Sequence, residues 1–400
     1  MTTLSSATLD FINAHLHDDV RTLALQARKY PEVAMETAIL QIAGRKVMAE
    51  KVPSWSAVEE LLYPRHLSLE QCSSEATARY KASLASGERF ADLTGGFGID
   101  CAFLSKRFVQ ATYVERQEDL CKLAAHNFPL LGLRHIRVCQ EDGIAYLEQM
   151  QPVDLLFIDP ARRNEQGGKM VALSDCEPDV AALAPLLARK ARQALIKLSP
   201  MLDLTLALRD MPGTQEAHIL SVNNECKELL LMTTAQQTEQ VKIHCVNLTS
   251  KGGIQTFCFT REAEQTAECL YTDQLGAYLY EPNASILKAG AFRSIAASYK
   301  VKKLHPNSHL YTSNEPRPDF PGRTFRITAT GSLHKKEFKE LMQGATKANL
   351  TVRNFPATVA ELRKRTRLEE GGDIYLFATT LSNEQKVMIR AEKAEIISFL

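Results

Sequence analysis

A glycine-rich stretch that begins with an acid is the first place where this sequence could do chemistry. It reads Asp92-Leu93-Thr94-Gly95-Gly96-Phe97-Gly98 and starts at the end of a short apolar run. Glycines allow a backbone to approach a ligand without a Cβ clash, and a helix after such a turn presents unpaired N–H groups to it. The stretch is therefore a candidate ligand-binding loop, with an ordinary glycine turn as the alternative.

The residues around this loop favour a cationic ligand over a phosphate. The dinucleotide fingerprint G-x-G-x-x-G needs a third glycine for close helix packing, whereas Ile99, Asp100 and Cys101 follow Gly98 here. The acidic Asp92 would also repel a pyrophosphate. S-adenosylmethionine has no phosphate but carries an ammonium group and a sulfonium, so an acidic loop suits it.

Two further acids, Glu115 and Asp142, lie at the ends of the next two apolar runs. Glu115 follows the loop by about twenty residues, where an acid can accept hydrogen bonds from both hydroxyls of a ribose. Its alternative is a surface ion pair with Arg116 or Lys122. Asp142 can accept from an adenine amino group, and it can also cap a helix that begins at Gly143, two roles that are compatible.

A fourth acid lies in the segment Asp159-Pro160-Ala161-Arg162-Arg163, directly after the apolar run 153–158. We interpret Asp159, Pro160 and Arg162 as catalytic candidates, and Asp159 also as a cofactor contact, because this position adjoins the reacting end of the ligand in an open sheet. Transfer of a methyl group depends mainly on proximity and alignment, which a carboxylate here could provide. The alternative is a strand-ending Asp-Pro turn with two solvated arginines.

Short apolar, β-branched runs that alternate with amphipathic stretches from about Arg89 to Met232 must position these acids. This order is typical of an α/β fold in which helices cover a parallel, Rossmann-like sheet. Ligands of such sheets bind at the carboxyl ends of the strands, so we expect the acids to meet at one edge. The seven expected strands are residues 90–93, 112–114, 136–139, 155–158, 194–197, 218–222 and 229–233.

The pattern of apolar and polar residues changes outside this sheet. Residues 1–85 show helical spacing, and residues 241–260 suggest a further antiparallel strand and turn within a sheet domain of 86–262. Prolines mark joints among the short elements of 263–322, and 323–400 predict a small α+β unit. The sequence shows no internal repeat.

The composition of the chain limits which partners and cellular locations are expected. The chain has 48 Lys and Arg against 47 Asp and Glu, so any basic site must be local. We expect a cytoplasmic protein without a membrane span, because no secretory signal or long apolar stretch occurs. The nine cysteines include no Cys-x-x-Cys pair, so we expect buried free thiols and neither a metal site nor disulfides.

The loop Asp92–Gly98, Glu115, Asp142 and Asp159-Pro160 together resemble motifs I to IV of the class I S-adenosylmethionine-dependent methyltransferases. More closely, the chain resembles a bacterial group of these enzymes with a ferredoxin-like insert and a C-terminal THUMP-like domain. Three further segments carry this likeness, namely 71–75 (QCSSE), 197–201 (KLSPM) and 280–290 (YEPNASILKAG). The resemblance spans nearly the whole chain, and the last segment is specific to the group. It implies a ferredoxin-like domain at 263–322 and a THUMP-like domain at 323–400.

The resemblance also implies S-adenosylmethionine as cofactor and structured RNA, tRNA or rRNA, as substrate, because THUMP domains bind RNA in tRNA-modifying enzymes. Clustered cations hold phosphates whatever the sequence of the nucleic acid. The candidate substrate contacts are Lys335, Lys336, Arg363 and Arg365, each with a solvated helix face as its alternative. Other cations of these regions are Lys300, Lys302, Lys303, His305, Lys339, Lys347, Arg353, Lys364 and Arg367.

One departure from the relatives limits the mechanism. Methyltransferases that act on amino groups usually carry Pro-Pro and an aromatic residue after the acid, whereas Ala161 and Arg162 follow Pro160 here. Uracil-C5 enzymes use a cysteine nucleophile, which neither 159–163 nor 197–201 contains. Direct transfer to a nitrogen, with Asp159 as orienting acceptor or base, is the preferred hypothesis.

Two alternatives to an RNA methyltransferase stay open. The acceptor could be a protein or a small molecule, or the chain could bind cofactor and RNA without transferring a methyl group. The modified nucleotide and the oligomeric state are not predicted. Four residues could line the same cleft or serve only as caps and turns, namely Ser73, Ser74, Asn223 and Asn224.

Overall fold

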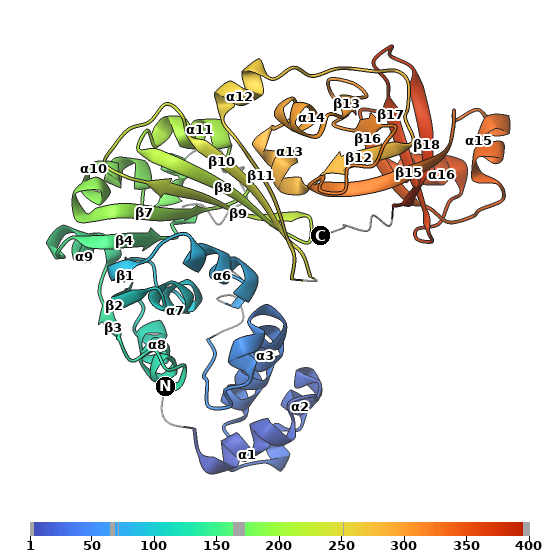
Figure 1. Ribbon diagram of the computed structural model, residues 1–400. Helices are drawn as coiled ribbons and strands as arrows, with labels where there is room; N and C mark the ends of the chain where they lie inside the picture. Colours follow the sequence, from blue (N-terminus) through green and yellow to red (C-terminus); the bar gives the residue numbers. More distant parts are fainter. Residues whose placement is uncertain (1–3, 65–68, 71, 163–172, 251, 395–400) are drawn as a thin grey trace. The chain divides into compact units, whose positions relative to one another are not determined.

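The computed structural model describes residues 4–64, 69–70, 72–162, 173–250 and 252–394 of the 400-residue chain (Figure 1). The chain divides into two compact units. Unit 1 comprises Met1–Ala217 and Glu228–Glu239, and unit 2 comprises His218–Lys227 and Gln240–Leu400. Two residues singled out in the sequence, Gln71 and Arg163, lie outside the described residues.

Helices fill the first part of unit 1, drawn in blue in Figure 1, as the sequence predicts. They are α1 (Ser6–Ala14), α2 (Val20–Leu25), the 3₁₀ turn η1 (Ala27–Lys29), α3 (Met35–Lys51), α4 (Pro53–Ser56) and α6 (Glu75–Ser83). Ser5 and Asp19 begin α1 and α2, because their side chains accept hydrogen bonds from the amides of Thr8 and Thr22. A small core forms among Phe11, Ile12, Leu23, Ala38 and Ile42.

The predicted strands belong to a nine-stranded sheet. Its strands are β1 (Gly87–Asp92), β2 (Phe108–Glu115), β3 (Ile136–Gln140), β4 (Val153–Ile158), β7 (Ala191–Leu198), β8 (Thr214–Val222), β9 (Glu225–Thr233), β10 (Lys242–Leu248) and β11 (Ile254–Phe259). Their order is β11-β10-β8-β9-β7-β4-β1-β2-β3, and the division between the two units falls within β8 and again within β9. All seven predicted strands are confirmed, each longer than predicted, as is the antiparallel addition in 241–260.

The pairing of these strands is parallel where the sequence predicts it. β1 pairs in parallel with β2 and β4, β2 with β3, and β4 with β7, whereas β7 and β9 are antiparallel. The intervening helices are α7 (Ile99–Ser105), α8 (Glu118–Leu130), α9 (Gly143–Gln149), α10 (Val180–Lys190) and α11 (Leu204–Asp210), with η2 (Leu173–Asp175) before α10. The short strands β5 (Ala161–Arg162) and β6 (Cys176–Glu177) form a separate pair. The fold class is therefore α/β with a Rossmann-like sheet.

A second sheet lies within unit 2. Its strands are β12 (Tyr278–Pro282), β13 (Lys302–Lys303), β14 (Tyr311–Ser313), β15 (Gly322–Gly331), β16 (Asn349–Arg353), β17 (Ile374–Thr380) and β18 (Lys386–Lys393), in the order β13-β14-β12-β15-β18-β17-β16. The helices of the unit are α12 (Arg261–Thr266), α13 (Ala284–Ala289), α14 (Ser294–Tyr299), α15 (Lys335–Met342) and α16 (Val359–Thr366). The regions expected to be ferredoxin-like and THUMP-like thus contribute strands to one sheet.

Two apolar clusters pack against this second sheet. Leu341 of α15 and Leu362 of α16 belong to one cluster, together with Leu376 and Met388 of the sheet. The other cluster contains Leu279, Leu304, Leu310, Phe325, Phe377 and Ile389. Because side chains alternate along a strand, neighbours such as Leu376 and Phe377 fall into different clusters. The sheet therefore buries apolar side chains on both faces.

The cysteine prediction needs a correction. All nine cysteines are free, as expected, but only Cys101, Cys121, Cys176 and Cys245 are buried. Cys258 is exposed because it lies on the edge strand β11, where one face of the strand is uncovered. Among the residues that the structure describes, no helix combines the length and apolarity needed to cross a bilayer.

Candidate active site

The carboxyl ends of β1 and β4 adjoin where the strand order reverses. β2 and β3 lie on one side of β1, and β4 and β7 lie on the other. Open parallel sheets bind their ligands at such a switch point. The glycine loop follows β1 and Asp159 follows β4, so the two segments with the strongest chemical signal in the sequence lie side by side at this edge.

The glycine loop is held against the end of β2. The amide of Gly95 donates to the carbonyl of Val114 (2.9 Å), and a Cβ at Gly95 would lie only 2.3 Å from the ring of Tyr113. Gly96 (φ +53°) and Gly98 (φ +87°) have left-handed backbone conformations that side chains with a Cβ disfavour. The hydroxyl of Tyr113 donates to the carbonyl of Gly96 (2.6 Å). The loop thus requires glycine at these positions.

Phe97 fastens the loop to the N-terminal helices. Its side chain is buried and packs edge-on against Trp55, with the ring centroids 5.5 Å apart, and against Tyr63 at 6.1 Å. Its side chain therefore belongs to the core, and only its backbone could make the predicted contact with a cofactor.

Glu115 is fixed towards the glycine loop. Its Oε2 accepts a hydrogen bond from the amide of Gly96 (2.9 Å), and its Oε1 accepts from the amide of Gln117 (2.9 Å). The carboxylate is largely buried. The ion pair considered as its alternative does not form among the described residues, because Lys122 pairs with Glu118 (2.7 Å).

Asp142 borders the other side of the loop. Its Oδ1 accepts hydrogen bonds from the amides of Ile144 (2.9 Å) and Ala145 (3.1 Å), which confirms the predicted cap of α9. Gly143 approaches the loop so closely that a Cβ there would lie 2.2 Å from the carbonyl oxygen of Leu93. The start of α9 is therefore packed against the backbone of the loop.

Asp159 is connected both to the loop and to a lysine. Its amide donates to the hydroxyl of Thr94 (2.7 Å), and its Oδ2 lies 2.5 Å from the ammonium nitrogen of Lys197 on β7. The side chain of Asp159 is 37% exposed, so a substrate can reach it. Pro160 is partly buried, and Arg162 lies in β5, whose backbone pairs with β6.

Lys197 belongs to a buried cluster that we call the carboxylate–lysine network. Its members are Ser73, Lys81, Asp100, Asp159, Lys197 and Glu228. The fully buried ammonium of Lys81, on α6, lies 2.6 Å from Glu228 Oε2 and 3.0 Å from Asp100 Oδ1. The hydroxyl of Ser73 donates to Asp100 Oδ2 (2.7 Å), which lies 3.6 Å from Lys197.

The network carries more negative than positive charge. Its three carboxylates face two ammonium groups, so one negative charge is left when all groups are ionised. Burial raises the pKa of Asp159 above its usual value, and the nearby Lys197 opposes that rise. Burial would lower the pKa of Lys197, but the carboxylates of Asp159 and Asp100 together raise it. Lys197 is therefore a permanent cation beside a carboxylate that accepts a proton more readily than usual.

Asp92 differs from these acids. Burial raises the pKa of Asp92 well above its usual range, although the hydrogen bond from the amide of Thr94 (3.0 Å) opposes the rise. The neighbouring carboxylate of Asp100 raises it further. A positive ligand at the switch point would favour the ionised form of Asp92, so this side chain can respond to ligand binding.

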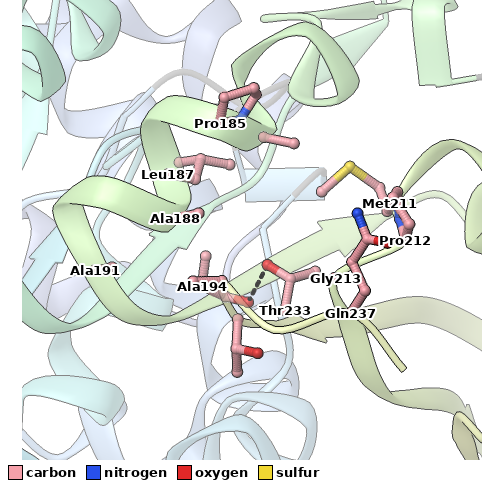
Figure 2. Close-up of a pocket in the computed structure, with 13 residues that line it drawn as sticks. Pro185, Leu187, Ala188, Ala191, Ala194, Met211, Pro212, Gly213, Thr233 and Gln237 are labelled. Atoms are coloured by element: carbon pink, nitrogen blue, oxygen red, sulfur yellow. Dashed lines mark hydrogen bonds between the residues drawn. The ribbon is translucent and has the colours of Figure 1, made fainter.

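A cavity of about 220 Å³ lies elsewhere on the sheet (Figure 2). Figure 2 shows Pro185, Leu187 and Ala188 of α10 on one side of it, and Met211 to Gly213 on another. It touches Ala191 and Ala194 near the amino end of β7, whereas Lys197 lies near the carboxyl end. Its lining residues are uncharged, and the cavity is not part of the candidate active site.

Comparison with solved structures decides the family. The crystal structure of a provisionally assigned methyltransferase from Porphyromonas gingivalis W83 is 35% identical to this chain, with a TM-score of 0.88. The match covers 99% of this chain and 100% of that one. The chain belongs to this methyltransferase family.

Family profiles agree with this assignment for the C-terminal part of the methyltransferase. A ferredoxin-like domain profile matches residues 278–321, and a THUMP domain-like profile matches residues 322–393. The two domain types expected from the sequence are thus confirmed. A search of curated proteins finds no match.

More distant solved structures include a complex with a cofactor product and an rRNA methylase. M. capricolum TrmK in complex with S-adenosyl-homocysteine is 11% identical, covers 41% of this chain and 70% of its own, and has a TM-score of 0.32. An rRNA methylase from Streptococcus thermophilus is 12% identical, covers 40% and 96%, and has a TM-score of 0.31. These scores are too low to support an argument about this methyltransferase.

The network joins segments that the sequence singled out separately. Ser73 comes from the QCSSE segment, Asp100 follows the glycine loop, and Lys197 begins the KLSPM segment. Sequence reasoning missed Lys81 and Glu228, and it gave Asp100 no role. The sequence offered one signal, for the two acids: Asp100 lies within an apolar run and Glu228 directly precedes one.

Other predicted residues of the methyltransferase have structural roles. Ser74 caps α6, and Asn223 and Asn224 form the turn after β8 with φ of +49° and +65°. The cap and turn alternatives therefore hold for these three residues. Ser73 is the exception, because its hydroxyl donates to Asp100, which shares Lys197 with Asp159.

The four substrate candidates in the methyltransferase do not share one environment. Lys335 and Lys336 are exposed at the start of α15, and Arg365 is exposed on α16. Arg363 instead uses Nη1 and Nη2 to donate to the carbonyls of Leu368 (3.1 Å) and Ala348 (3.2 Å). Arg363 thus holds the chain after α16, which leaves it less able to meet a substrate.

Proposed function

We propose that this methyltransferase transfers the methyl group of S-adenosylmethionine to a nitrogen atom of structured RNA, either tRNA or rRNA. The observation that carries the proposal is the carboxylate–lysine network beneath Asp159, at the switch point of the sheet. It combines two buried acid–lysine charge balances with one further, reachable carboxylate, Asp159, which gives the network a net negative charge when all groups are ionised. A sulfonium and an ammonium are the groups that such a site attracts.

The residues around the glycine loop fit this cofactor. The positive φ of Gly96 leaves bare, partly exposed backbone at the switch point, while Gly98 is buried against the ring of Phe128. We assign the methionine portion to Asp92, Thr94, Gly95 and Gly96, with Phe97 and Gly98 continuing the cradle. Glu115 keeps lone pairs on both oxygens beyond its two amide donors, so it can also accept from the ribose hydroxyls. We assign Asp142 to the adenine. When bound, the cofactor supplies an electrophilic methyl group.

Asp159 is the residue that we assign to the methyl acceptor. Lys197 holds Oδ2, so the carboxylate cannot rotate freely, and Oδ1 is the atom available to the incoming nitrogen. A carboxylate fixed in this way can align a substrate N–H by accepting its hydrogen bond, and can then take its proton. Pro160 stiffens the turn after Asp159, and we assign Arg162 to a phosphate or a base carbonyl of the substrate.

RNA is the acceptor that the rest of the chain favours. The THUMP domain-like profile covers residues 322–393, and cations lie exposed in the same region, among them Lys335, Lys336 and Arg365. Exposed cations bind the phosphate backbone without regard to base sequence. Arg363 stays among the proposed substrate contacts only because it lies on the same helix as Arg365.

Transfer of radiolabelled methyl groups from S-adenosylmethionine tests the function. We expect label in total RNA from cells that lack the gene, and no label with RNA from cells that contain it, because the site is already modified there. Label in protein or in small molecules would contradict the RNA assignment. Cofactor and RNA binding without any transfer would show a catalytically silent protein. Nucleoside mass spectrometry would then identify the modified atom.

A further inference from the structure

The segment 280–290, one of the segments that carry the family resemblance, contains a buried acid that the active site does not use. Glu281 lies in β12 and is 2% exposed. Its Oε1 accepts hydrogen bonds from Nε (3.1 Å) and Nη2 (2.8 Å) of Arg353 on β16. Its Oε2 accepts from Nε (2.8 Å) and Nη2 of Arg323 on β15. One carboxylate therefore holds two arginines, which we call the arginine pair.

The arginine pair remains accessible although its acid is buried. The side chains of Arg323 and Arg353 are 40% and 39% exposed. Each uses Nε and Nη2 on Glu281, and neither Nη1 group has a hydrogen-bond partner among the described residues. A guanidinium has five N–H donors in a planar fork, so each arginine can still bind an anion through its outer edge.

The charge around the pair is positive. Two guanidinium groups against one carboxylate leave one positive charge. Burial, together with the nearby cations Lys303 and Arg353, lowers the pKa of His309 to about 4. The positive charges of Lys303 and Arg353, which disfavour a proton on His309, also favour an anion beside Arg353.

A purely structural tie does not account for this arrangement. One arginine would satisfy Glu281, whereas a second one adds an uncompensated charge, and two guanidinium groups so close together repel each other. Such repulsion is relieved when a second anion binds on the outer side. The pair therefore has the chemistry of a preformed anion site, with Glu281 fixing the orientation of both forks.

We propose that Arg323 and Arg353, oriented by Glu281, bind a backbone phosphate of the RNA substrate. The proposal rests on the proposed function, because it takes RNA as the acceptor. Arginine forks match the geometry of phosphate oxygens, and two of them can hold one phosphodiester from two sides. The segment 280–290 then serves substrate binding, while the glycine loop and Asp159 serve the reaction.

Binding of end-labelled bulk tRNA by the full chain, followed by fluorescence anisotropy over a series of KCl concentrations, tests the site. We expect Arg323→Gln and Arg353→Gln each to weaken binding roughly tenfold, as for loss of a charged hydrogen bond. Each should also reduce the dependence of log K on log salt by about one, the effect of one lost phosphate contact. Arg353→Lys keeps the charge and should keep the salt dependence.

The matched control is Arg326→Gln. Arg326 lies on the same strand, pairs with Glu392 (3.4 Å), and stands an odd number of residues from Arg323, so its side chain points to the other face. Its tRNA affinity should be unchanged. A structural tie would instead lower the melting temperature in both Arg353 variants and leave the salt dependence intact, which would overturn the proposal.

Other outcomes separate the site from the function. RNA methylation with undiminished tRNA binding by both glutamine variants overturns the site alone. Arginine-dependent tRNA binding without any methylation of RNA overturns the proposed function and leaves the site standing. Absence of binding by the wild type to both bulk tRNA and rRNA overturns both. Saturable binding of inorganic phosphate in calorimetry, dependent on Arg353 but without effect on tRNA, would show a free-anion site and also overturn the proposal.

Discussion

Two clusters of acidic and basic side chains have net charges of opposite sign. They are the carboxylate–lysine network of unit 1 and the arginine pair of unit 2. In the network, Lys81 is fully buried and the acids outnumber the lysines. In the pair, the acid is buried, the two cations are partly exposed, and the positive charges are in excess. Two properties of such a cluster therefore determine which ligand it can bind. They are the sign of its net charge and the chemical group that remains exposed.

Substitution of Asp159 should have the largest effect and would test the negative cluster directly. Asp159→Ala should leave the affinity for S-adenosylmethionine nearly unchanged but reduce methyl transfer roughly a thousandfold, since it removes the proposed acceptor-side carboxylate. Calorimetry and single-turnover transfer measure the two quantities. Asp159→Asn keeps the shape and should be almost as inactive. Equal loss of binding and transfer would mean that Asp159 is structural.

Loss of the buried lysine should have the next largest effect, on stability. Lys81→Met leaves Glu228 buried without its closest cation and Asp100 with only the more distant Lys197, which costs about 3–5 kcal/mol in the free energy of unfolding. Urea unfolding followed by circular dichroism measures it. Lys122→Met, which breaks the exposed pair with Glu118, should leave stability unchanged. A similar small change for Lys81 would show that the network is not tightly coupled.

A pair of glycine substitutions would separate backbone strain from loss of the cofactor cradle. Gly96 and Gly132 both have positive φ, +53° and +74°, and a Cβ at Gly132 meets nothing within 4 Å. Gly96→Val should weaken S-adenosylmethionine binding roughly a hundredfold, because a β-branched residue forces the loop out of shape. Gly132→Val carries similar strain and should bind normally in calorimetry. Equal affinities would refute the assignment of the loop.

The smallest expected effect is a shift in pH dependence. Burial raises the pKa of Asp159 and Lys197 opposes this, so Lys197→Met should raise that pKa further. If Asp159 must be ionised to accept a proton, the acid limb of the pH profile of methyl transfer moves to higher pH. Lys190→Met, whose ammonium donates to the carbonyl of Met150 (2.7 Å), is the control and should leave the profile in place. A shift to lower pH would contradict the proposed role.

Much of unit 1 could be predicted because its signals are local. Apolar β-branched runs predict the strands, and parallel strands bring their carboxyl ends to one edge, so the proximity of Glu115 and Asp142 to the loop followed from strand order. Lys81 could not be predicted in this way, because in the sequence it resembles any lysine on a helix. Its partner Glu228 lies 147 positions away, on a strand that runs antiparallel to β7.

Unit 2 was harder to predict because its contacts also join segments that lie far apart in the sequence. Its strands are short and interrupted, and its sheet order does not follow the chain. Arg353 appeared in the sequence as one of many cations, and only its contact with Glu281, 72 positions earlier, sets it apart. Arg363 illustrates the opposite case, because it looked like a substrate contact and its side chain is used within the fold. These roles depend on contacts between distant segments, which composition and spacing do not reveal.

The position of Lys81 on α6 limits how freely the methyltransferase can be dissected. An excised piece that began at the first strand of the sheet would retain every recognised motif of the reaction centre. It would nevertheless hold two acids without the lysine that lies between them, next to Lys197 and the proposed acceptor-side carboxylate of Asp159. Helix α6 is thus inseparable from the proposed chemistry, and a piece without it should not be an autonomous working catalyst.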